Sequence, residues 1–248
     1  MYADLNIQWP AGAPALAEQR AAEMLALLVE LQYDVVALNV VAASPKEAKQ
    51  VLATSLAPAL PRLRALFPLR ILKRVTLVLD DGTTSPNLAL LAGEPGLFDI
   101  VAVAPRTEKQ LQSCATALDI DLICIETGSR LPFPLRHKLC GAAVARGVCF
   151  EVCYAARALR HLVANAAILF RAARHRGVVV SSGAASAADL RAPLDVANLV
   201  ALWGLNPAAA KNSVSVWPVE QATQGVLRSS AKQAVISQPS DAKRVKTA

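Results

Sequence analysis

Residues 99–125 read DIVAVAPRTEKQLQSCATALDIDLICI, and this stretch decides the fold. An apolar, β-branched run at 99–104 predicts a strand, a polar segment with helical spacing at 107–118 predicts a helix, and 121–125 predicts a second strand. Thr107 followed by Gln110 is the pattern of a capping box at a helix start. Two strands joined by a helix indicate a parallel pair, because parallel neighbours need a long crossover.

The same alternation continues in both directions along the chain. Strands are expected at residues 2–5, 34–41, 71–79, 99–104, 121–125, 148–153 and 178–181. Helices are expected at 15–31, 45–52, 87–91, 107–118, 136–146, 158–176, 194–203 and 207–214, whereas three prolines favour a long loop at 53–70. Short apolar strands separated by helices predict an α/β fold with a parallel sheet.

We expect a TIM-like β/α barrel over residues 1–217, with room for a short eighth strand. The alternative is a doubly wound open sheet, although no G-x-G-x-x-G or phosphate-loop motif follows any expected strand. From residue 218 the composition becomes polar and loses its periodicity. Residues 218–248 are therefore expected to be a flexible, disordered tail.

Composition excludes several classes of protein. The chain has 248 residues, of which 54% are hydrophobic, so it can bury a large core and is not a disordered protein. Five scattered cysteines do not predict a disulfide scaffold and favour a reducing compartment. No apolar run reaches the ~18 residues of a membrane helix, and the N-terminus lacks a signal-peptide pattern.

The formal net charge of +7 is unevenly distributed. Residues 1–129 carry a balance of −4, residues 130–176 a balance of +8, and residues 177–248 a balance of +3. Glu151 is the only acidic residue of the basic stretch, which is rich in arginine. Arginine suits phosphate, so an anionic partner is favoured; the alternative is a solvated face whose acids come from elsewhere in the fold.

The C-terminal strand ends are where a barrel places its function. These positions hold Asp4 with Asn6, Asn39, Asp80 with Asp81, Arg106, Glu126, Tyr154 with Arg157, and Ser181 with Ser182. None of the three histidines lies there, which disfavours a metal hydrolase; loose Mg²⁺ binding by Asp4, Asp80 and Glu126 is the alternative. Ser181 and Ser182 predict either a phosphate-binding turn or a tight barrel turn. Cys149 and Cys153 are expected in the core rather than as a metal pair.

Several segments together resemble one known family. They are residues 3–6 (ADLN), 38–39 (LN), 72–77 (LKRVTL), 98–103 (FDIVAV), 105–109 (PRTEK), 118–123 (LDIDLI), 146–154 (RGVCFEVCY), 180–184 (VSSGA) and 191–199 (RAPLDVANL). In order and spacing, from residue 2 to about 215, they resemble the TIM-barrel-like, thirty-kilodalton protein subunit of eukaryotic and archaeal ribonuclease P. In eukaryotes that subunit is shared with ribonuclease MRP.

The resemblance implies a barrel distantly related to the polymerase-and-histidinol-phosphatase metal hydrolases. Those enzymes carry His-x-His after the first strand, whereas this chain has Asp4-Leu5-Asn6. The implied role is a non-catalytic subunit without catalytic or metal-binding residues, bracing an RNA that removes the 5′ leader of tRNA. The RNA would hold the Mg²⁺.

The implied partners are the ribonuclease P and MRP RNAs, a second small protein subunit and other proteins of the particle. Pre-rRNA processing and a nuclear, nucleolar location follow from the same resemblance, with no membrane or small-molecule substrate. A basic cluster at 243–246 (KRVK) suits nuclear import or weak RNA contact.

Exposed basic residues would contact the RNA phosphates. The candidates are Arg106, Lys109, Arg130, Arg136, Lys138, Arg157, Arg160, Arg174 and Arg176. Lys73 and Arg74 are expected to face outward or to pair with Asp80 or Asp81.

Two further functions stay open at this point: a metal-dependent phosphoesterase on the same barrel, and a barrel that only joins other proteins. The segment at 194–203 is apolar on nearly all sides, so either a partner protein or residues 207–216 would cover it.

Overall fold

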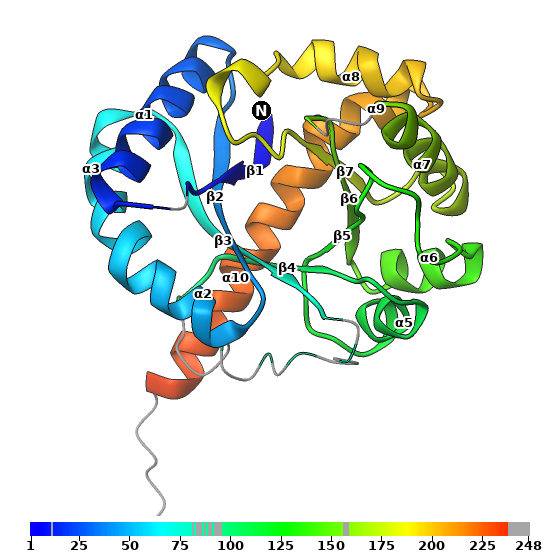
Figure 1. The fold of residues 1–248 in the computed structure, drawn as a ribbon, viewed down its shortest axis with the longest axis horizontal. Coiled ribbons are helices and arrows are strands. Elements are labelled where there is room, and N and C mark those ends of the chain that lie inside the picture. Colours follow the sequence, from blue (N-terminus) through cyan, green and yellow to red (C-terminus); the bar gives the residue numbers. More distant parts are fainter. Residues whose placement is uncertain are drawn as a thin grey trace, which may run out of the picture.

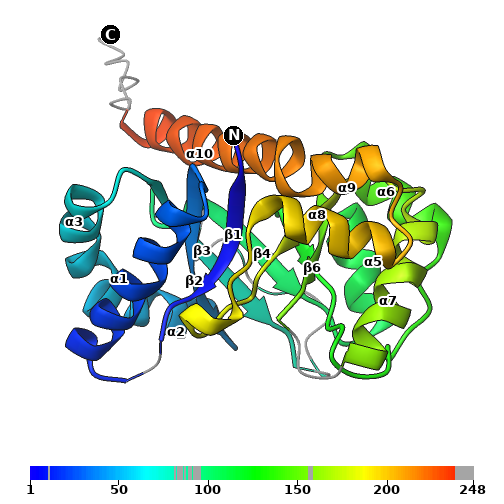
Figure 2. The same ribbon diagram turned by 90° about the horizontal axis from the view of Figure 1, so that it is seen from above.

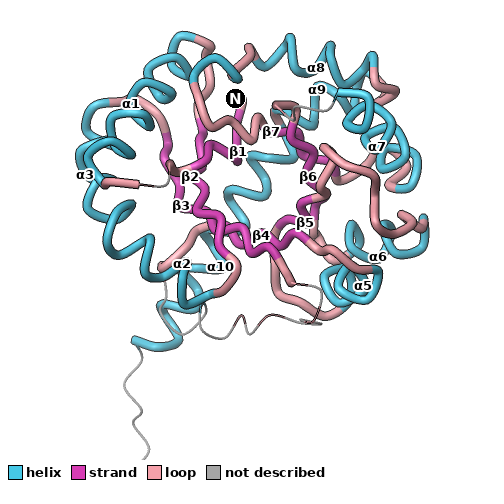
Figure 3. The backbone as a smooth tube through the Cα atoms, viewed as in Figure 1, coloured by secondary structure: helices cyan, strands magenta, loops and turns pink. Residues whose placement is uncertain are grey.

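Seven parallel strands form the centre of the molecule in the computed structural model, which describes residues 1–10, 12–80, 96–155 and 159–237, with 82, 86, 88 and 91. The strands are β1 (Ala3–Gln8), β2 (Val35–Ala42), β3 (Arg70–Val78), β4 (Ile100–Ala104), β5 (Leu122–Cys124), β6 (Cys149–Cys153) and β7 (Val178–Ser181). They pair in chain order and enclose a ring (Figures 1 and 3). The predicted barrel is confirmed, and the open-sheet alternative is wrong.

Helices surround this ring on its outer side (Figure 1). They are α1 (Pro14–Glu30), α2 (Pro45–Val51), α3 (Ala57–Leu66), α5 (Glu108–Thr116), α6 (His137–Ala145), α7 (Leu159–Ala172), α8 (Pro193–Leu202) and α9 (Pro207–Val214). A π-helical turn, η1 (Leu52–Leu56), joins α2 to α3, and a 3₁₀ turn, η2 (Ala187–Asp189), precedes α8. No helix among the described residues has the length and apolar character needed to cross a membrane.

The capping box predicted for α5 is present. The Thr107 hydroxyl accepts a hydrogen bond from the Gln110 backbone at 3.3 Å, and the Gln110 side-chain oxygen accepts one from the Thr107 backbone at 3.1 Å. Gln110 also donates to the Asp80 carbonyl at 2.7 Å. The start of α5 is thereby tied to the end of β3.

The seam between β1 and β7 closes the barrel without a regular ladder. The Gln8 backbone N–H donates to the Ala184 carbonyl at 2.9 Å, and Ile7 forms an isolated parallel bridge with Ala184. β1 changes its register against β2 between Asp4 and Ile7. Seven strands therefore close through this irregular strand end.

Two apolar clusters follow from the alternation of strand residues. In β3, Ile71, Val75 and Leu77 pack against the helices, whereas Leu72 lies in the cluster inside the barrel. Arg74 and Thr76 share the parity of Leu72 and are also buried. The barrel interior is therefore filled by side chains, apolar toward the N-terminal ends of the strands and polar toward their C-terminal ends.

The loop predicted at residues 53–70 is wrong, because η1 and α3 occupy most of it. Pro58 lies in the first turn of α3, where its missing N–H costs little, and Pro61 is accommodated within the helix. Leu56, Leu60 and Leu63 are buried on one side of this segment. Burial of that side outweighs the unfavourable effect of the prolines. The helix predicted at 87–91 falls mostly outside the described residues.

The tail predicted from residue 218 is wrong for residues 218–237, which belong to α10 (Val216–Ser237). This helix lies across the N-terminal mouth of the barrel (Figure 2). Ala222 is buried in the interior cluster, with Trp217, Val219 and Val226 packed against it. The contact side of this helix carries small and polar residues, so the sequence lacks the apolar periodicity that would predict a helix here. Residues 238–248, including the basic cluster at 243–246, lie outside the described residues.

Candidate functional site

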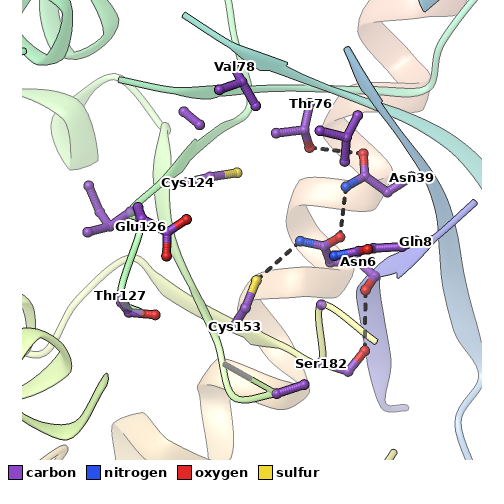
Figure 4. Close-up of a pocket in the computed structure, with 15 residues that line it drawn as sticks. Asn6, Gln8, Asn39, Thr76, Val78, Cys124, Glu126, Thr127, Cys153 and Ser182 are labelled. Atoms are coloured by element: carbon purple, nitrogen blue, oxygen red, sulfur yellow. Dashed lines mark hydrogen bonds between the residues drawn. The ribbon is translucent and has the colours of Figure 1, made fainter. Parts of the chain in front are cut away.

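The C-terminal ends of the strands meet around one cavity of about 340 Å³ at the open mouth of the barrel (Figure 4). Asn6 and Gln8 come from β1, Asn39 from β2 and Thr76 from β3, and all four line it. Glu126 lies on the opposite wall in Figure 4. The prediction that strand-end residues gather here is confirmed for Asn6, Asn39, Glu126 and Ser182.

A buried ion pair lies inside the barrel, beneath the residues that line this cavity. Arg74 and Glu151 are 0% and 1% exposed, with Arg74 Nη1 to Glu151 Oε1 and Arg74 Nη2 to Glu151 Oε2 both at 2.5 Å. The expectation that Arg74 faces outward or pairs with Asp80 or Asp81 is therefore wrong. Its place at an inward position of β3 directs it to a carboxylate on β6 across the barrel.

A closed ring of hydrogen bonds connects the ion pair to three strand-end side chains. Arg74 donates to the Thr76 hydroxyl, which donates to Asn39 Oδ1 at 2.9 Å. Asn39 Nδ2 donates to Asn6 Oδ1 at 2.7 Å, and Asn6 Nδ2 donates to Glu151 Oε2 at 3.1 Å. Because every member has a partner, the ring holds β1, β2, β3 and β6 together at one level.

Burial and the ion pair together shift the pKa values of Glu151 and of two neighbouring thiols. Burial raises the pKa of Glu151, but the charge and hydrogen bonds of Arg74, with a hydrogen bond from Cys124, outweigh it and bring the pKa below its ordinary value. Burial, followed by the charge of Glu151, raises the pKa of Cys124 and Cys153 well above the ordinary thiol value. Protonated thiols are weak nucleophiles, so the site contains no activated cysteine among the described residues.

The side chains at this site are not suited to bind a metal ion. Both oxygens of Glu151 already accept hydrogen bonds, from Arg74, Asn6 and Cys124, and a guanidinium at the barrel centre repels a divalent cation. Among the described residues, no group of three His, Cys, Asp or Glu side chains is placed to hold a metal. Asp4 is buried under the seam, which separates it from the exposed Asp80 and Glu126. The site therefore gives no support to loose Mg²⁺ binding by these three residues.

Asp4 closes the seam of the barrel. Its two carboxylate oxygens accept from the Ser182 backbone at 3.2 Å, and one of them accepts from the Asn6 backbone at 3.0 Å. The Ser182 hydroxyl donates to the Asn6 carbonyl at 3.2 Å. Ser181 and Ser182 are both buried, and these bonds fit the tight barrel turn; because Ser182 also lines the cavity, phosphate binding at this turn stays a prediction.

Replacement of Asp4 tests this closure. Asp4→Ala leaves the buried N–H groups of Asn6 and Ser182 unpaired, and we expect a loss of about 2–4 kcal/mol in the free energy of unfolding. Asp4→Asn keeps one acceptor oxygen and should lose clearly less. Urea denaturation at neutral pH measures both variants; equal losses would show that the carboxylate does not act as the acceptor.

The predicted basic residues lie at two ends of the barrel. Arg106, Lys109, Arg130, Arg136, Lys138 and Arg160 are exposed in the loops that follow β4 and β5 and in the first turns of α5, α6 and α7, on the mouth side. Arg174 and Arg176 are exposed in the turn between α7 and β7, at the opposite end. Arg157 lies outside the described residues. We call the first set the mouth-side basic group.

The mouth-side basic group has few local acids. Arg136 pairs with Glu108 at 3.1 Å, but both side chains are largely exposed and the pair is weak. Glu151, the only acid of residues 130–176, is enclosed in the barrel with Arg74. Glu151 therefore does not neutralise the mouth-side basic group.

Sequence reasoning missed Arg74 and Glu151 as partners, although each carried a signal. Both are charged residues in the middle of apolar strands, ILKRVTLVL at 71–79 and CFEVC at 149–153. A charge at such a position is buried only with a partner. Cys149 lies in the core, as predicted, near the floor of the barrel.

Comparison with known proteins assigns the chain to a family. The model of the family described as RNase P subunit p30 matches residues 1–231. The Mus musculus ribonuclease P protein subunit p30 is 34% identical over 224 residues, covering 86% of this chain and 82% of that protein. The Saccharomyces cerevisiae ribonuclease P/MRP protein subunit RPP1 is 33% identical over 219 residues, covering 83% of this chain and 74% of that protein.

Solved structures agree with the fold. A chain of an archaeal ribonuclease P with mature tRNA superposes with a TM-score of 0.59 at 15% identity, covering 94% of this chain and 92% of that chain. The phosphotriesterase from Mycobacterium tuberculosis superposes with a TM-score of 0.53 at 12% identity, covering 89% and 93%. The model match and the relatives above 30% identity lead to one conclusion. The chain belongs to the RNase P subunit p30 family.

Proposed function

We propose that this chain is a non-catalytic protein subunit of ribonuclease P, and of ribonuclease MRP as well, that binds and braces the RNA of the particle. The family match over residues 1–231 carries the proposal. The barrel centre supports it, because a fixed ion pair and protonated thiols stand where a hydrolase would need a metal or a nucleophile. The RNA would perform the cleavage of tRNA 5′ leaders and hold the Mg²⁺.

The mouth-side basic group is the surface that we propose for RNA phosphates. Three of its side chains, Lys109, Lys138 and Arg160, project from the first turns of helices, where the helix dipole also favours anions. Arg174 and Arg176 would reach a second RNA segment at the other end. A second small protein subunit, other proteins of the particle, pre-rRNA as the MRP substrate and a nucleolar location complete the proposal.

Affinity purification of the tagged full-length chain tests this function. We expect an RNA to copurify that, with its proteins, removes 5′ leaders from precursor tRNA. An intact complex without such an RNA would contradict the proposal, and protein-only partners would favour the joining role. Metal-dependent turnover of a simple phosphoester by the purified chain would instead favour the phosphoesterase.

Salt dependence tests the RNA surface. Each phosphate contact that is lost should lower the slope of log K against log salt by about one, so Arg130→Ala with Arg160→Ala should lower it by about two. Filter binding between low and moderate salt measures the slope. Arg62→Ala is the matched control, because Arg62 is an exposed arginine on α3 that pairs with Glu18. An unchanged slope in the double variant would remove these two residues from the RNA surface.

A further inference from the structure

Two cavities adjoin at the mouth of the barrel, and their linings differ in chemistry. The first, of about 340 Å³, is lined by amides and hydroxyls together with apolar side chains. The second, of about 500 Å³, is lined by Arg106, Arg130, Thr107 and Ser129. Val78, Ala104 and Glu126 line both, so the cavities share a wall. Each volume lies in the range of small-molecule sites, which is about 300–1,000 Å³.

The first cavity offers neutral polar groups and apolar walls. Asn6, Asn39 and Thr76 are occupied by the hydrogen-bond ring, but the side chains of Gln8 and Thr127 make no hydrogen bond within the described part of the chain. Thr127 is 3% exposed, and its hydroxyl points into the cavity in Figure 4. The residue is buried, but its hydroxyl is accessible from the cavity, so it is available to a ligand or to water.

The second cavity offers positive charge. Arg106 and Arg130 are exposed, and neither guanidinium forms an ion pair within the described residues. Two exposed arginines line this cavity together with Thr107 and Ser129, and these cations and hydroxyls suit a phosphate.

Glu126 stands between the two cavities. Its Oε1 accepts from the Gly128 backbone at 2.9 Å, and Oε2 has no partner among the described residues. A carboxylate repels phosphate but accepts hydrogen bonds from sugar hydroxyls, as acidic residues do from ribose in dinucleotide sites. Its place between a neutral pocket and an arginine pocket matches the place of a sugar between a base and a phosphate.

We propose that the two cavities together bind one unpaired ribonucleotide. The base enters the first cavity, where Gln8 and Thr127 contact its edge and Val78 and Ile125 contact its face. Glu126 accepts from the 2′-hydroxyl, and Arg106 and Arg130 hold the phosphate. The inference rests on the proposed function for the source of the nucleotide, which is a base extruded from the RNA partner.

Calorimetric titration of the full-length chain tests the site without the particle. The probes are the four 5′-ribonucleoside monophosphates, their 2′-deoxy counterparts and inorganic phosphate. We expect saturable binding of at least one ribonucleotide, at least about tenfold weaker binding of its deoxy counterpart, and weaker binding still of phosphate. Equal binding of all three would indicate a simple anion site and would overturn the proposal, as would no binding.

Substitutions test which side chain contacts the ribose and which contacts the phosphate. Glu126→Gln should abolish the preference for ribose while retaining phosphate binding, and Arg130→Ala should weaken ribonucleotide and phosphate alike. Arg171→Ala, which removes an exposed arginine on α7 away from both cavities, should change neither. A ribose preference that survives in Glu126→Gln would contradict the assignment of Glu126.

Two RNA hairpins test whether the bound nucleotide belongs to an RNA or is a free nucleotide. One hairpin carries a single bulged nucleotide, and the other is fully paired. Tighter binding of the bulged hairpin, lost in Glu126→Gln, supports the RNA; a preference for free nucleotides over both hairpins would overturn the RNA source. RNA copurification is scored separately. Copurification without nucleotide binding would overturn the pocket alone, whereas nucleotide binding without copurification would overturn the proposed particle function.

Discussion

A chain that ends after residue 217 is expected to be severely destabilised or unfolded. It lacks α10, so the apolar residues inside the barrel would meet water at the N-terminal mouth. Asp121 would lose Arg228, whose Nη2 lies 2.7 Å from Asp121 Oδ2. Burial already raises the pKa of Asp121 against the opposing effect of Arg228. Loss of this partner alone is expected to cost about 3 kcal/mol or more, because a buried carboxylate would remain unpaired.

The control is a chain that ends after Ser237. It keeps Gln221, which donates to the Gly147 carbonyl at 2.8 Å, and it keeps the Arg228 pair. Its melting temperature should equal that of the full chain. Thermal and urea unfolding compare the three lengths. Stability of the 217-residue chain within about 0.5 kcal/mol of the full chain would show that α10 does not hold the barrel floor.

A single substitution tests the same contact. A Cβ atom at Gly225 would lie 2.2 Å from the Asp99 carbonyl oxygen, so α10 approaches the start of β4 too closely for any side chain at this position. Gly225→Ala must therefore displace the helix, whereas Gly82→Ala, where a Cβ meets nothing within 4 Å, should not have a comparable effect. The first variant should reproduce part of the loss seen on truncation.

Periodicity predicts the barrel because most of its elements carry repeated local signals. The apolar runs of β2, β3, β4 and β6 and the capping box of α5 are each contained in a few residues. α10 lacked this signal, because its contact side carries small and polar residues such as Ala222, Gly225 and Gln221. Its place depends on the shape of a barrel mouth that the other strands build.

The polar centre was only partly predictable for the same reason. Parallel strands direct Asn6, Asn39 and Ser182 to one mouth, so their proximity follows from fold class and strand ends. Arg74 and Glu151 are 77 positions apart, and their pairing depends on β3 and β6 facing each other across a closed barrel. Local sequence patterns do not show which residues face each other across a closed barrel.

Removal of one member of this pair should also have a large effect. Arg74→Met leaves Glu151 buried without its cation and breaks the hydrogen bond from Arg74 to the Leu5 carbonyl. Breaking a buried ion pair on one side costs about 3–5 kcal/mol. Arg74→Met with Glu151→Gln removes the unpaired charge while keeping an acceptor for Asn6, so it should recover a substantial part of that loss.

The contribution of Glu151 to the pH dependence of stability should have opposite signs in the native chain and in Arg74→Met. In the native chain the pKa of Glu151 is lowered, so its contribution is present above the unfolded-state pKa and is lost as pH falls through the folded-state value. In Arg74→Met only burial remains as the large effect, and the pKa should rise. The variant should then be relatively more stable at mildly acid pH and lose stability as pH increases. Urea unfolding across this range measures the slope, with the double variant as the control that lacks the titrating group. If stability in Arg74→Met still rises with pH, water must reach Glu151 once the arginine is gone. The interior of the barrel would then not exclude water from this carboxylate.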